Sequence, residues 1–422
     1  MTVSSVLVVG GGIAGVSTAA ELRKQGYVGE LTLLTVDPFP YDRPPLSKEY
    51  LAGAKDLGSI ALQAAGWYAE QRIDLVAPAL VESLDPAAGT VVLMGGRQLS
   101  ADRIVLATGG NSRWPDFERV VGERLDFPPA GEGIPISTTG IHTLRSAEDA
   151  DALQHVLLAR ARLLVVGAGL IGAEVASTAR KLGCEVVLVD PADPPIAVAV
   201  GTRVAAWLHS LHAVHGVETV TATVEKLEST RVGVVAHIAG EVEPRTFDAV
   251  LLAVGMGPDT ALAKAAGLEV DNGVLVDDHQ VTSHPNVLAV GDCARRRGRR
   301  RAEHWEAALH DGQRAATTIL GVDAGAETAP WFWTDRYDLH VEVVGEMHDP
   351  DSEHENVVRG ALGEPPFSVF TLRGERVIGA VAVDDPNAVR AARRMIDRGV
   401  DVRASDLADP QTDLRKLLRG SR

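Results

Sequence analysis

Cysteine is nearly absent from this chain of 422 residues, which contains only Cys184 and Cys293. Two cysteines exclude a disulfide-rich scaffold and any cysteine-rich metal or iron–sulfur site. No Cys-x-x-Cys dithiol occurs anywhere in the sequence. A chain of this length can bury several hydrophobic cores, so it needs neither disulfides nor a metal to fold. We therefore expect both cysteines to be inert packing thiols.

Basic residues are fewer than acidic ones. The chain has 41 Lys and Arg against 57 Asp and Glu, which gives a net charge of −16. This balance argues against nucleic acids and anionic membranes as main partners. No apolar run reaches the roughly 18 residues of a membrane span, and the first residues lack the basic segment of a signal peptide. The sequence predicts a cytoplasmic protein.

A glycine-rich turn occurs twice, each time between an apolar segment and a segment rich in small residues. The first copy is Gly10-Gly11-Gly12-Ile13-Ala14-Gly15, and the second is Gly167-Ala168-Gly169-Leu170-Ile171-Gly172. Both fit a buried strand, a Gly-x-Gly-x-x-Gly turn and a helix. The first glycine permits the tight turn, the second lets a pyrophosphate approach the backbone, and the third lets the helix pack on the sheet. Free N–H groups at the start of the helix bind the phosphates.

An acid follows each turn at the distance expected for a contact with ribose. Asp37 and Asp190 each end a second apolar segment, about 20 residues after the last glycine of their turn. The alternative for either copy is a glycine-rich turn that binds no ligand. Two copies, each followed by a matching acid, argue against this alternative. Two dinucleotide sites imply that one dinucleotide reduces another, and FAD with a nicotinamide is the natural pair.

Three further apolar segments end where such a fold contacts its cofactors. Residues 103–110 include Ala107 and Thr108, residues 249–255 end at Gly255, and residues 287–292 end at Asp292. We expect Asp292 to accept a hydrogen bond from the ribityl chain of a flavin, with a simple turn aspartate as the alternative.

The chain divides into three predicted domains. Residues 1–112 and 254–322 form an FAD-binding domain interrupted by an NAD-binding domain at 113–253, and residues 323–422 form a small α+β domain. In the last domain, segments 339–344, 367–372 and 377–383 read as antiparallel strands, and 387–396 as a helix. The segment 114–135, dense in proline, glycine and charge, reads as a long irregular connection.

Several longer motifs resemble one family across nearly the whole chain. The motifs are Tyr41-Asp42-Arg43-Pro44-Pro45-Leu46-Ser47-Lys48, residues 142–150, Glu303-His304-Trp305 and residues 330–335. They resemble the oxygenase-coupled, FAD-dependent NADH:ferredoxin reductases, the putidaredoxin reductase and rubredoxin reductase group. The resemblance implies an α/β fold like that of glutathione reductase, with two Rossmann-like domains and a C-terminal α+β domain. It also implies electron flow from NADH through FAD to a small iron–sulfur protein, a [2Fe-2S] ferredoxin, that serves a cytochrome P450 or a ring-hydroxylating oxygenase.

The resemblance and the strand-end signals together give a set of cofactor contacts. For FAD they are Gly10, Gly12, Ala14, Gly15, Asp37, Arg43, Lys48, Val81, Ala107, Thr108, Arg145, Asp292 and Trp305. For NADH they are Gly167, Gly169, Leu170, Ile171, Gly172, Glu174, Asp190 and Gly255. No arginine follows Asp190 within residues 191–199 to bind a 2′-phosphate, which favours NADH over NADPH.

Two residues are candidates for tuning the hydride transfer. Lys48 could place a positive charge beside the flavin, and Glu174 could pair with Lys48 and face the nicotinamide. The alternatives are a solvated surface lysine and a glutamate that serves helix packing. Residues 41–45 contain no cysteine, which excludes thiol-dependent relatives such as disulfide reductases and NADH peroxidases.

A basic run stands out in the acidic chain. We expect a docking surface for an acidic ferredoxin formed by Arg295, Arg296, Arg297, Arg299, Arg300 and Arg301, helped by Arg314 and Arg336. The alternative is a solvated loop. His209, His212 and His215 have no metal-ligand spacing and should lie on a helix surface, and no metal site is expected. An NADH:rubredoxin reductase and a redox-sensing flavoprotein like apoptosis-inducing factor remain alternative functions.

Overall fold

The computed structural model describes residues 3–115, 118–121, 140–230, 233–349, 351 and 353–418, with only the backbone of 118–121. These residues form two compact units. Unit 1 consists of Met1–Pro45, Lys55–Asn111 and Met256–Ala326, and unit 2 consists of Leu46–Ala54, Ser112–Gly255 and Glu327–Arg422. Most of the expected irregular connection at 114–135 lies outside the described residues. The division into three domains stays a prediction.

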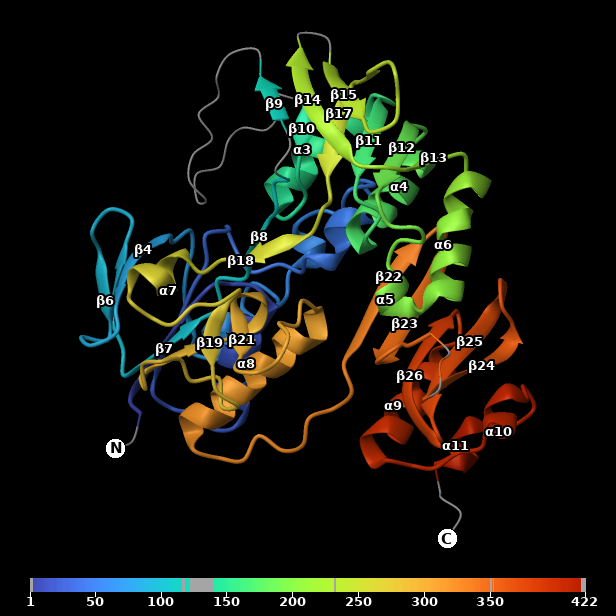
Figure 1. Ribbon diagram of the computed structural model, residues 1–422. Helices are drawn as coiled ribbons and strands as arrows, with labels where there is room; N and C mark the ends of the chain where they lie inside the picture. The colour runs from blue at the N-terminus through green and yellow to red at the C-terminus, as the bar shows by residue number, and fades with distance from the viewer. Residues whose placement is uncertain are drawn as a thin grey trace. The chain divides into compact units, whose positions relative to one another are not determined.

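A parallel five-stranded sheet organises unit 1 (Figure 1). Its order is β20 (Val287–Ala289), β7 (Arg103–Leu106), β1 (Ser5–Val9), β2 (Glu30–Leu34) and β3 (Asp74–Val76). Strand β1 lies between β2 and β7, so the strand order reverses at its carboxyl end, where such sheets bind ligands.

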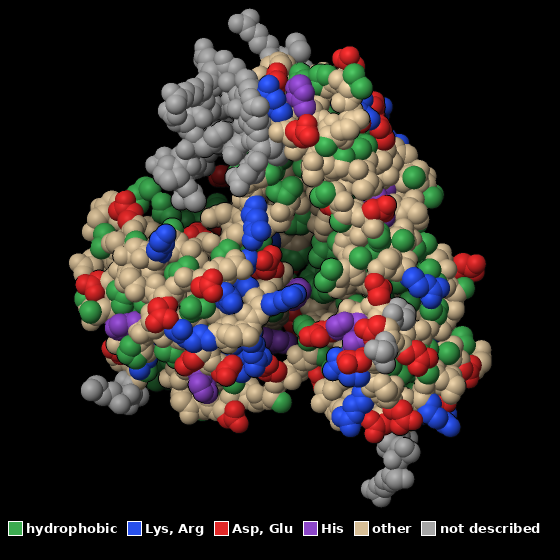
Figure 2. All heavy atoms as spheres, viewed as in Figure 1, with side chains coloured by type: hydrophobic (Ala, Val, Ile, Leu, Met, Phe, Trp, Pro, Cys, Tyr) green, Lys and Arg blue, Asp and Glu red, His purple; other side chains and the backbone are tan. Residues whose placement is uncertain are grey.

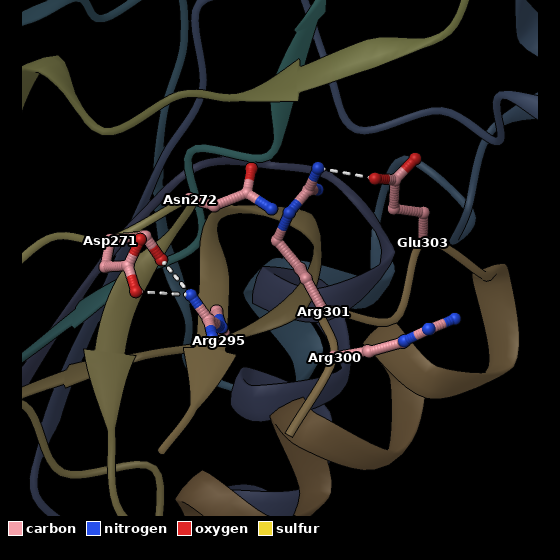
Figure 3. A pocket seen from close by; sticks show the side chains of 6 residues that line it. All are labelled: Asp271, Asn272, Arg295, Arg300, Arg301 and Glu303. Carbon is pink, nitrogen blue, oxygen red and sulfur yellow. Dashed lines mark hydrogen bonds and ion pairs between the residues drawn. The ribbon is translucent and has the colours of Figure 1, made fainter. Parts of the chain in front are cut away.

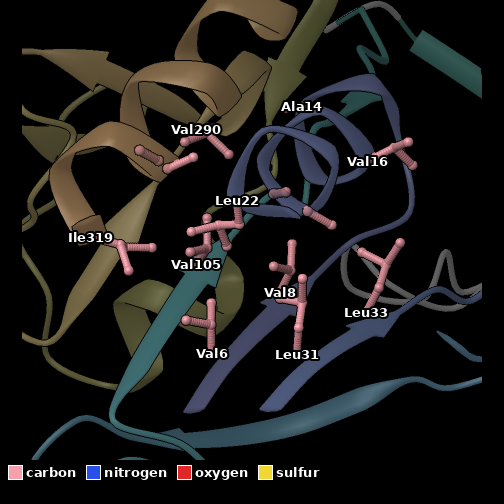
Figure 4. Close-up of a cluster of buried hydrophobic side chains, with 14 of the residues drawn as sticks. Val6, Val8, Ala14, Val16, Leu22, Leu31, Leu33, Val105, Val290 and Ile319 are labelled. Atoms are coloured by element: carbon pink, nitrogen blue, oxygen red, sulfur yellow. The ribbon is translucent and has the colours of Figure 1, made fainter. Parts of the chain in front are cut away.

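Strand β1 is buried on both faces, which explains its unbroken apolar run. Val6 and Val8 pack on one side, with helices α1 (Ile13–Lys24) and α8 (Trp305–Leu320), as Figure 4 shows. Leu7 and Val9 pack on the other side in a second cluster. The two clusters fix the position of the turn that follows β1.

Shorter elements complete unit 1. They are η2 (Gly58–Ile60), α2 (Trp67–Glu70), the antiparallel β4 (Val81–Asp85), β5 (Thr90–Leu93) and β6 (Gln98–Ser100), β18 (Met256–Pro258), α7 (Ala261–Ala265), the paired β19 (Val274–Val276) and β21 (Ala294–Arg296), and the short helix η4 (Gly291–Cys293). Two further short elements, the helix η1 (Pro44–Ser47) and the strand β8 (Gly110–Ser112), begin in unit 1 and end in unit 2.

A second parallel sheet in unit 2 repeats the arrangement. Its order is β10 (Ile141–His142), β17 (Ala249–Leu252), β11 (Arg162–Val166), β12 (Glu185–Asp190) and β13 (Glu218–Thr221). The helices of this part are α3 (Ala147–Leu158), α4 (Leu170–Lys181), α5 (Ala197–Val200) and α6 (Thr202–Val214). A separate four-stranded sheet has the order β16 (Arg245–Phe247), β15 (Gly233–Ile238), β14 (Val224–Thr230) and β9 (Glu118–Val121). Ser146 and Asp149 form a capping box at the start of α3, which fixes the loop that carries Arg145.

The C-terminal part of unit 2 is an antiparallel sheet with helices, as the alternating sequence predicted. The sheet order is β22 (Trp331–Arg336), β23 (Leu339–Gly345), β26 (Arg376–Val383), β25 (Glu364–Arg373) and β24 (His354–Ala361). Helix α9 (Pro386–Arg398) packs on it, followed by α10 (Ala404–Ala408) and α11 (Leu414–Leu417). No helix among the described residues is long and apolar enough to cross a membrane.

Candidate functional site: two dinucleotide cradles and an ion cluster

The first glycine turn has the three geometries that a dinucleotide cradle requires. Gly10 has a φ of +121°, and a Cβ there would overlap the carbonyl oxygen of Ala107. A Cβ on Gly15 would overlap the carbonyl oxygen of Gly10, so the helix approaches the turn closely. A Cβ on Gly12, in contrast, would meet no atom within 4 Å. Because the space over Gly12 is open, the turn fits a pyrophosphate.

The second glycine turn has the same geometry. Gly167 has a φ of +101°, and a Cβ there would overlap the carbonyl oxygen of Ala253. A Cβ on Gly172 would overlap the carbonyl oxygen of Gly167, while a Cβ on Gly169 would meet nothing within 4 Å. Gly255, just beyond β17, has a φ of +94° and also borders open space. The residues of unit 2 therefore fit a second dinucleotide.

Both helices that follow these turns begin with their N–H groups uncapped by side chains. Helix α1 has Gly12 as its N-cap and α4 has Gly169, and neither helix has an acid in its first turn. The N–H groups of Ala14, and of Leu170 and Ile171, therefore lie in turns whose partial positive charge favours a phosphate.

The two predicted ribose acids lie in different local settings. Asp190 is the last residue of β12, and its carboxylate accepts hydrogen bonds from the N–H of Ala168 at 2.7 Å and of Ala192 at 2.8 Å. Asp37 lies three residues beyond the end of β2 and accepts a hydrogen bond from the Tyr41 hydroxyl at 3.3 Å. Burial raises the pKa of Asp37, and Arg43 opposes this only in part.

The other predicted FAD contacts lie on several elements, and some of them border the first turn. Gly291, which precedes Asp292, approaches α1 so closely that a Cβ on it would lie 2.8 Å from the Cβ of Ala14. Ala107 and Thr108 follow β7, and Val81 begins β4. Trp305 begins α8, and its indole Nε1 donates to Asp42 at 2.7 Å. Arg145 and Lys48 belong to unit 2, so the structure does not place them beside the first turn.

An ion cluster in unit 2 contains the predicted pair of Lys48 and Glu174. Lys48 Nζ lies 3.4 Å from Glu174 Oε1 and 2.6 Å from Asp335 Oδ2, and only 13% of the Lys48 side chain is exposed. The predicted pairing is thus confirmed, whereas the roles of the two residues in the reaction stay predictions. Lys48 is no solvated surface lysine.

Three neighbours complete the cluster, and the sequence did not single them out as functional. Glu174 accepts hydrogen bonds from the hydroxyls of Ser47 at 2.5 Å and Thr334 at 2.7 Å. Asp335 is the third, and its other oxygen lies 2.6 Å from His340 Nδ1. The only sequence signal for Thr334 and Asp335 is the motif at 330–335.

The charges of this cluster reinforce one another. Burial alone would lower the pKa of Lys48, but Glu174 and Asp335 outweigh it and raise that pKa above its ordinary value. Burial would likewise raise the pKa of Asp335, but Lys48 and His340 hold it below its ordinary value. Lys48 therefore stays protonated and Asp335 ionised over the whole physiological range.

The structure corrects the predicted docking surface at two of its arginines, Arg301 of the basic run and Arg336 outside it. The prediction is wrong for Arg301, because only 2% of its side chain is exposed. The prediction is also wrong for Arg336, which is 3% exposed and lies buried near Glu174. A surface partner cannot contact either guanidinium, so neither residue supports docking.

Acidic side chains offset much of the remaining run. Arg295 pairs with Asp271 at 2.6 Å and Arg297 with Glu269 at 2.7 Å, while Asp278 lies between Arg296 and Arg299. Figure 3 shows the open pocket of about 590 Å³ that Arg295, Arg300 and Arg301 line together with Asp271, Asn272 and Glu303. In Figure 2, blue and red side chains are interspersed over the visible face. The local positive charge is therefore smaller than the sequence implied.

The cysteines and histidines give one confirmation and one correction. Cys184 and Cys293 are both fully buried, and burial raises the pKa of each thiol, so both are packing residues as expected. His212 was expected on a helix surface, but it is 1% exposed because it packs on Tyr337, whose hydroxyl lies 2.6 Å from its Nδ1. No group of His, Cys, Asp or Glu in the described part of the chain could hold a metal ion.

Two dinucleotide cradles on one chain, with no reactive cysteine near either, define an oxidoreductase that uses two nucleotides. Comparison with known proteins gives the family: the chain belongs to the pyridine nucleotide-disulphide oxidoreductases, whose family model matches residues 4–312. Residues 331–418 match the C-terminal domain of the reductases. The predicted fold class and family are thereby confirmed.

Named relatives cover the chain from end to end. Putidaredoxin reductase of Pseudomonas putida is 34% identical over 99% of this chain and 97% of its own length. The ferredoxin reductase component of chlorobenzene dioxygenase from a Cupriavidus species is 35% identical over 98% and 97%. The crystal structure of a covalent putidaredoxin reductase–putidaredoxin complex matches with a TM-score of 0.87 and 33% identity over 99% of both chains.

Proposed function

We propose that this chain is an FAD-dependent NADH:ferredoxin reductase. It transfers electrons from NADH through FAD to a small iron–sulfur protein that serves a cytochrome P450 or a ring-hydroxylating oxygenase. The observation that carries the proposal is the pair of open glycine cradles, over Gly12 and Gly169, in a chain similar over its whole length to such reductases. FAD supplies the chemistry between the partners, because it accepts two electrons together and releases them singly.

The residues of the chain supply binding and electrostatics. The turn at Gly10–Gly15 binds the pyrophosphate of FAD, and the turn at Gly167–Gly172 binds that of NADH, with Asp190 on its ribose. Lys48 provides a fixed positive charge held by Glu174 and Asp335, which stabilises negative charge that develops during reduction. Glu174 orients Lys48 from the first turns of α4.

The acceptor approaches, in this proposal, through the exposed part of the arginine run. Arg297, Arg299 and Arg300 are exposed, and 48% and 51% of the first two side chains contact solvent. Opposite charges across an interface raise the rate of association and fix its orientation. An acidic ferredoxin would meet these three guanidinium groups. We also place the protein in the cytoplasm, where two buried, unpaired cysteines are unremarkable.

The function is tested with the purified FAD-loaded protein, NADH and one candidate acceptor at a time. We expect [2Fe-2S] ferredoxins of P450 and dioxygenase systems to support rapid NADH-driven reduction of cytochrome c. Fast reduction of rubredoxin alone would make the chain a rubredoxin reductase. A long-lived NADH-reduced complex that no iron–sulfur protein reoxidises would instead indicate a redox-sensing flavoprotein.

Docking is tested separately by charge reversal. Changing Arg297, Arg299 and Arg300 to glutamate should raise the KM for ferredoxin while the rate with ferricyanide, which needs no docking, stays the same. The double change Arg403→Glu and Arg415→Glu is the control, since both side chains are exposed in the C-terminal segment. A normal ferredoxin KM in the triple variant would place docking elsewhere.

A further inference from the structure

Two side chains hold the short loop that carries Asp292. Arg301 donates from Nη1 to the carbonyl oxygen of Asp292 at 2.9 Å. From α8, Asp311 accepts the N–H of Gly291 at 3.3 Å. The main chain on both sides of the Gly291–Asp292 peptide is thus tied to the body of unit 1.

Arg301 is built into the fold, although it belongs to a basic run. Its second amino group pairs with Glu303, two residues before α8 begins (Figure 3). Its stem runs along Gly273, where an added Cβ would lie 3.2 Å from Arg301 Cδ. With its side chain 2% exposed, this guanidinium is almost completely buried, unlike that of its exposed neighbour Arg300.

We propose that Arg301 is a positioning residue for FAD, whose guanidinium holds the Asp292 loop in the conformation that presents the Asp292 carboxylate to the cofactor. This inference rests on the proposed FAD site at Asp292. A loop that is already held in its binding conformation loses little conformational entropy when the ligand binds. A loop that also samples other conformations can bind the ligand only in the fraction of molecules with the competent conformation, which lowers the apparent affinity.

The shape of the guanidinium separates positioning from simple charge. Its planar fork reaches Asp292 with one amino group and Glu303 with the other. A lysine keeps the charge but presents a single ammonium on a flexible stem, so it cannot reproduce both contacts. Lysine should therefore rescue an electrostatic role and fail to rescue a positioning role.

The experiment measures FAD affinity directly. Apoprotein variants are titrated with FAD, and quenching of flavin fluorescence reports the Kd. Loss of a hydrogen bond from a charged donor predicts that Arg301→Met weakens FAD binding by about 10- to 100-fold, and Arg301→Lys by about 10-fold. The matched control Arg300→Met should stay within about twofold, as a surface change does. At saturating FAD, Arg301→Lys should leave the KM for ferredoxin unchanged.

The result that overturns the proposal is an Arg301→Lys variant with wild-type FAD affinity. A raised ferredoxin KM at full FAD loading would also overturn it, since that outcome assigns Arg301 to docking. If Arg301→Met does not fold, as judged by circular dichroism, the proposal is tested with Arg301→Lys and with the control Glu303→Gln. The Glu303→Gln variant keeps the contact between Arg301 and Asp292, so its Kd for FAD should stay within about threefold of wild type. A wild-type protein that fails to bind FAD or to reduce any ferredoxin would refute the proposed function instead.

Discussion

Replacing Asp311 by asparagine should stabilise the protein at alkaline pH. Asp311 is a partly buried carboxylate on α8 that accepts hydrogen bonds from Gly291 N–H and from Gln280 Nε2, the latter at 2.7 Å. Burial raises its pKa to about 6, even though Arg296 and other neighbours oppose the shift. The folded protein therefore binds this proton more tightly than the unfolded chain, where the ordinary value of 3.8 applies.

The sign and size of the effect follow from this difference. The stabilisation from the bound proton is complete below about pH 4 and is lost as the pH rises through about 6. The pKa differs by about two, and each unit corresponds to about 1.4 kcal/mol, so the ionised carboxylate costs at most about 3 kcal/mol above pH 7. Asparagine avoids this cost. Its Oδ1 can still accept the N–H of Gly291, and once the Gln280 amide turns over, its Nδ2 can donate to Gln280 Oε1, which has no hydrogen-bond partner among the described residues.

The assay is urea unfolding of wild type and Asp311→Asn with excess FAD at about pH 8 and about pH 4.5. We expect the variant to gain roughly 1–3 kcal/mol over wild type at the higher pH and at most about 1 kcal/mol at the lower pH. A difference between the two proteins that is the same at both pH values would refute the assigned pKa. An equally large gain in Asp323→Asn, an exposed acid beyond α8, would show that the gain reflects net charge alone.

Other substitutions probe the cradles and the ion cluster. Lys48→Ala should slow reduction of bound FAD by NADH in stopped flow. It should also lower the free energy of unfolding by about 3 kcal/mol, because it leaves two carboxylates without their cation. The control Lys181→Ala removes an exposed ion pair and should change that free energy by less than about 1 kcal/mol, so equal losses in the two variants would contradict the buried cluster. Gly169→Ala should lower stability by less than about 1 kcal/mol, because alanine is a poorer N-cap than glycine, and raise the KM for NADH, because the new Cβ enters the open space over the turn. An unchanged KM would place NADH elsewhere. Burial lowers the pKa of His142 to about 4, so wild type should lose up to about 3 kcal/mol of stability as the pH falls from 6.5 towards 4, and His142→Leu should lose this dependence in acid unfolding experiments.

The glycine turns show why part of the site can be read from sequence. Their function depends on local backbone geometry, namely a positive φ at Gly10 and Gly167 and close contact of a helix with the preceding turn. Only glycine meets these demands, and the spacing from strand to helix is fixed within a few residues. The pairing of Lys48 with Glu174 was predicted too, from the chemistry expected at the flavin and the place of Glu174 on the helix after the second turn.

Neighbouring arginines show what the sequence could not decide. Arg300 and Arg301 are adjacent and chemically identical, yet one is exposed and the other buried against Gly273 and Asp292. Within a run of like residues, no local pattern separates the two, so the docking prediction wrongly included Arg301. The same holds for Arg336, buried near Glu174.

Taken by itself, the sequence determined the two nucleotide-binding motifs, the absence of a catalytic thiol and the family, because each depends on residue identities at short spacing. The tertiary structure alone decided which charges are available and which are built into the fold. Asp335 meets Lys48 across 287 residues, and Arg301 reaches back to Asp292. Burial and pairing of a charge depend on elements far apart in the chain, and only the folded chain brings these elements together.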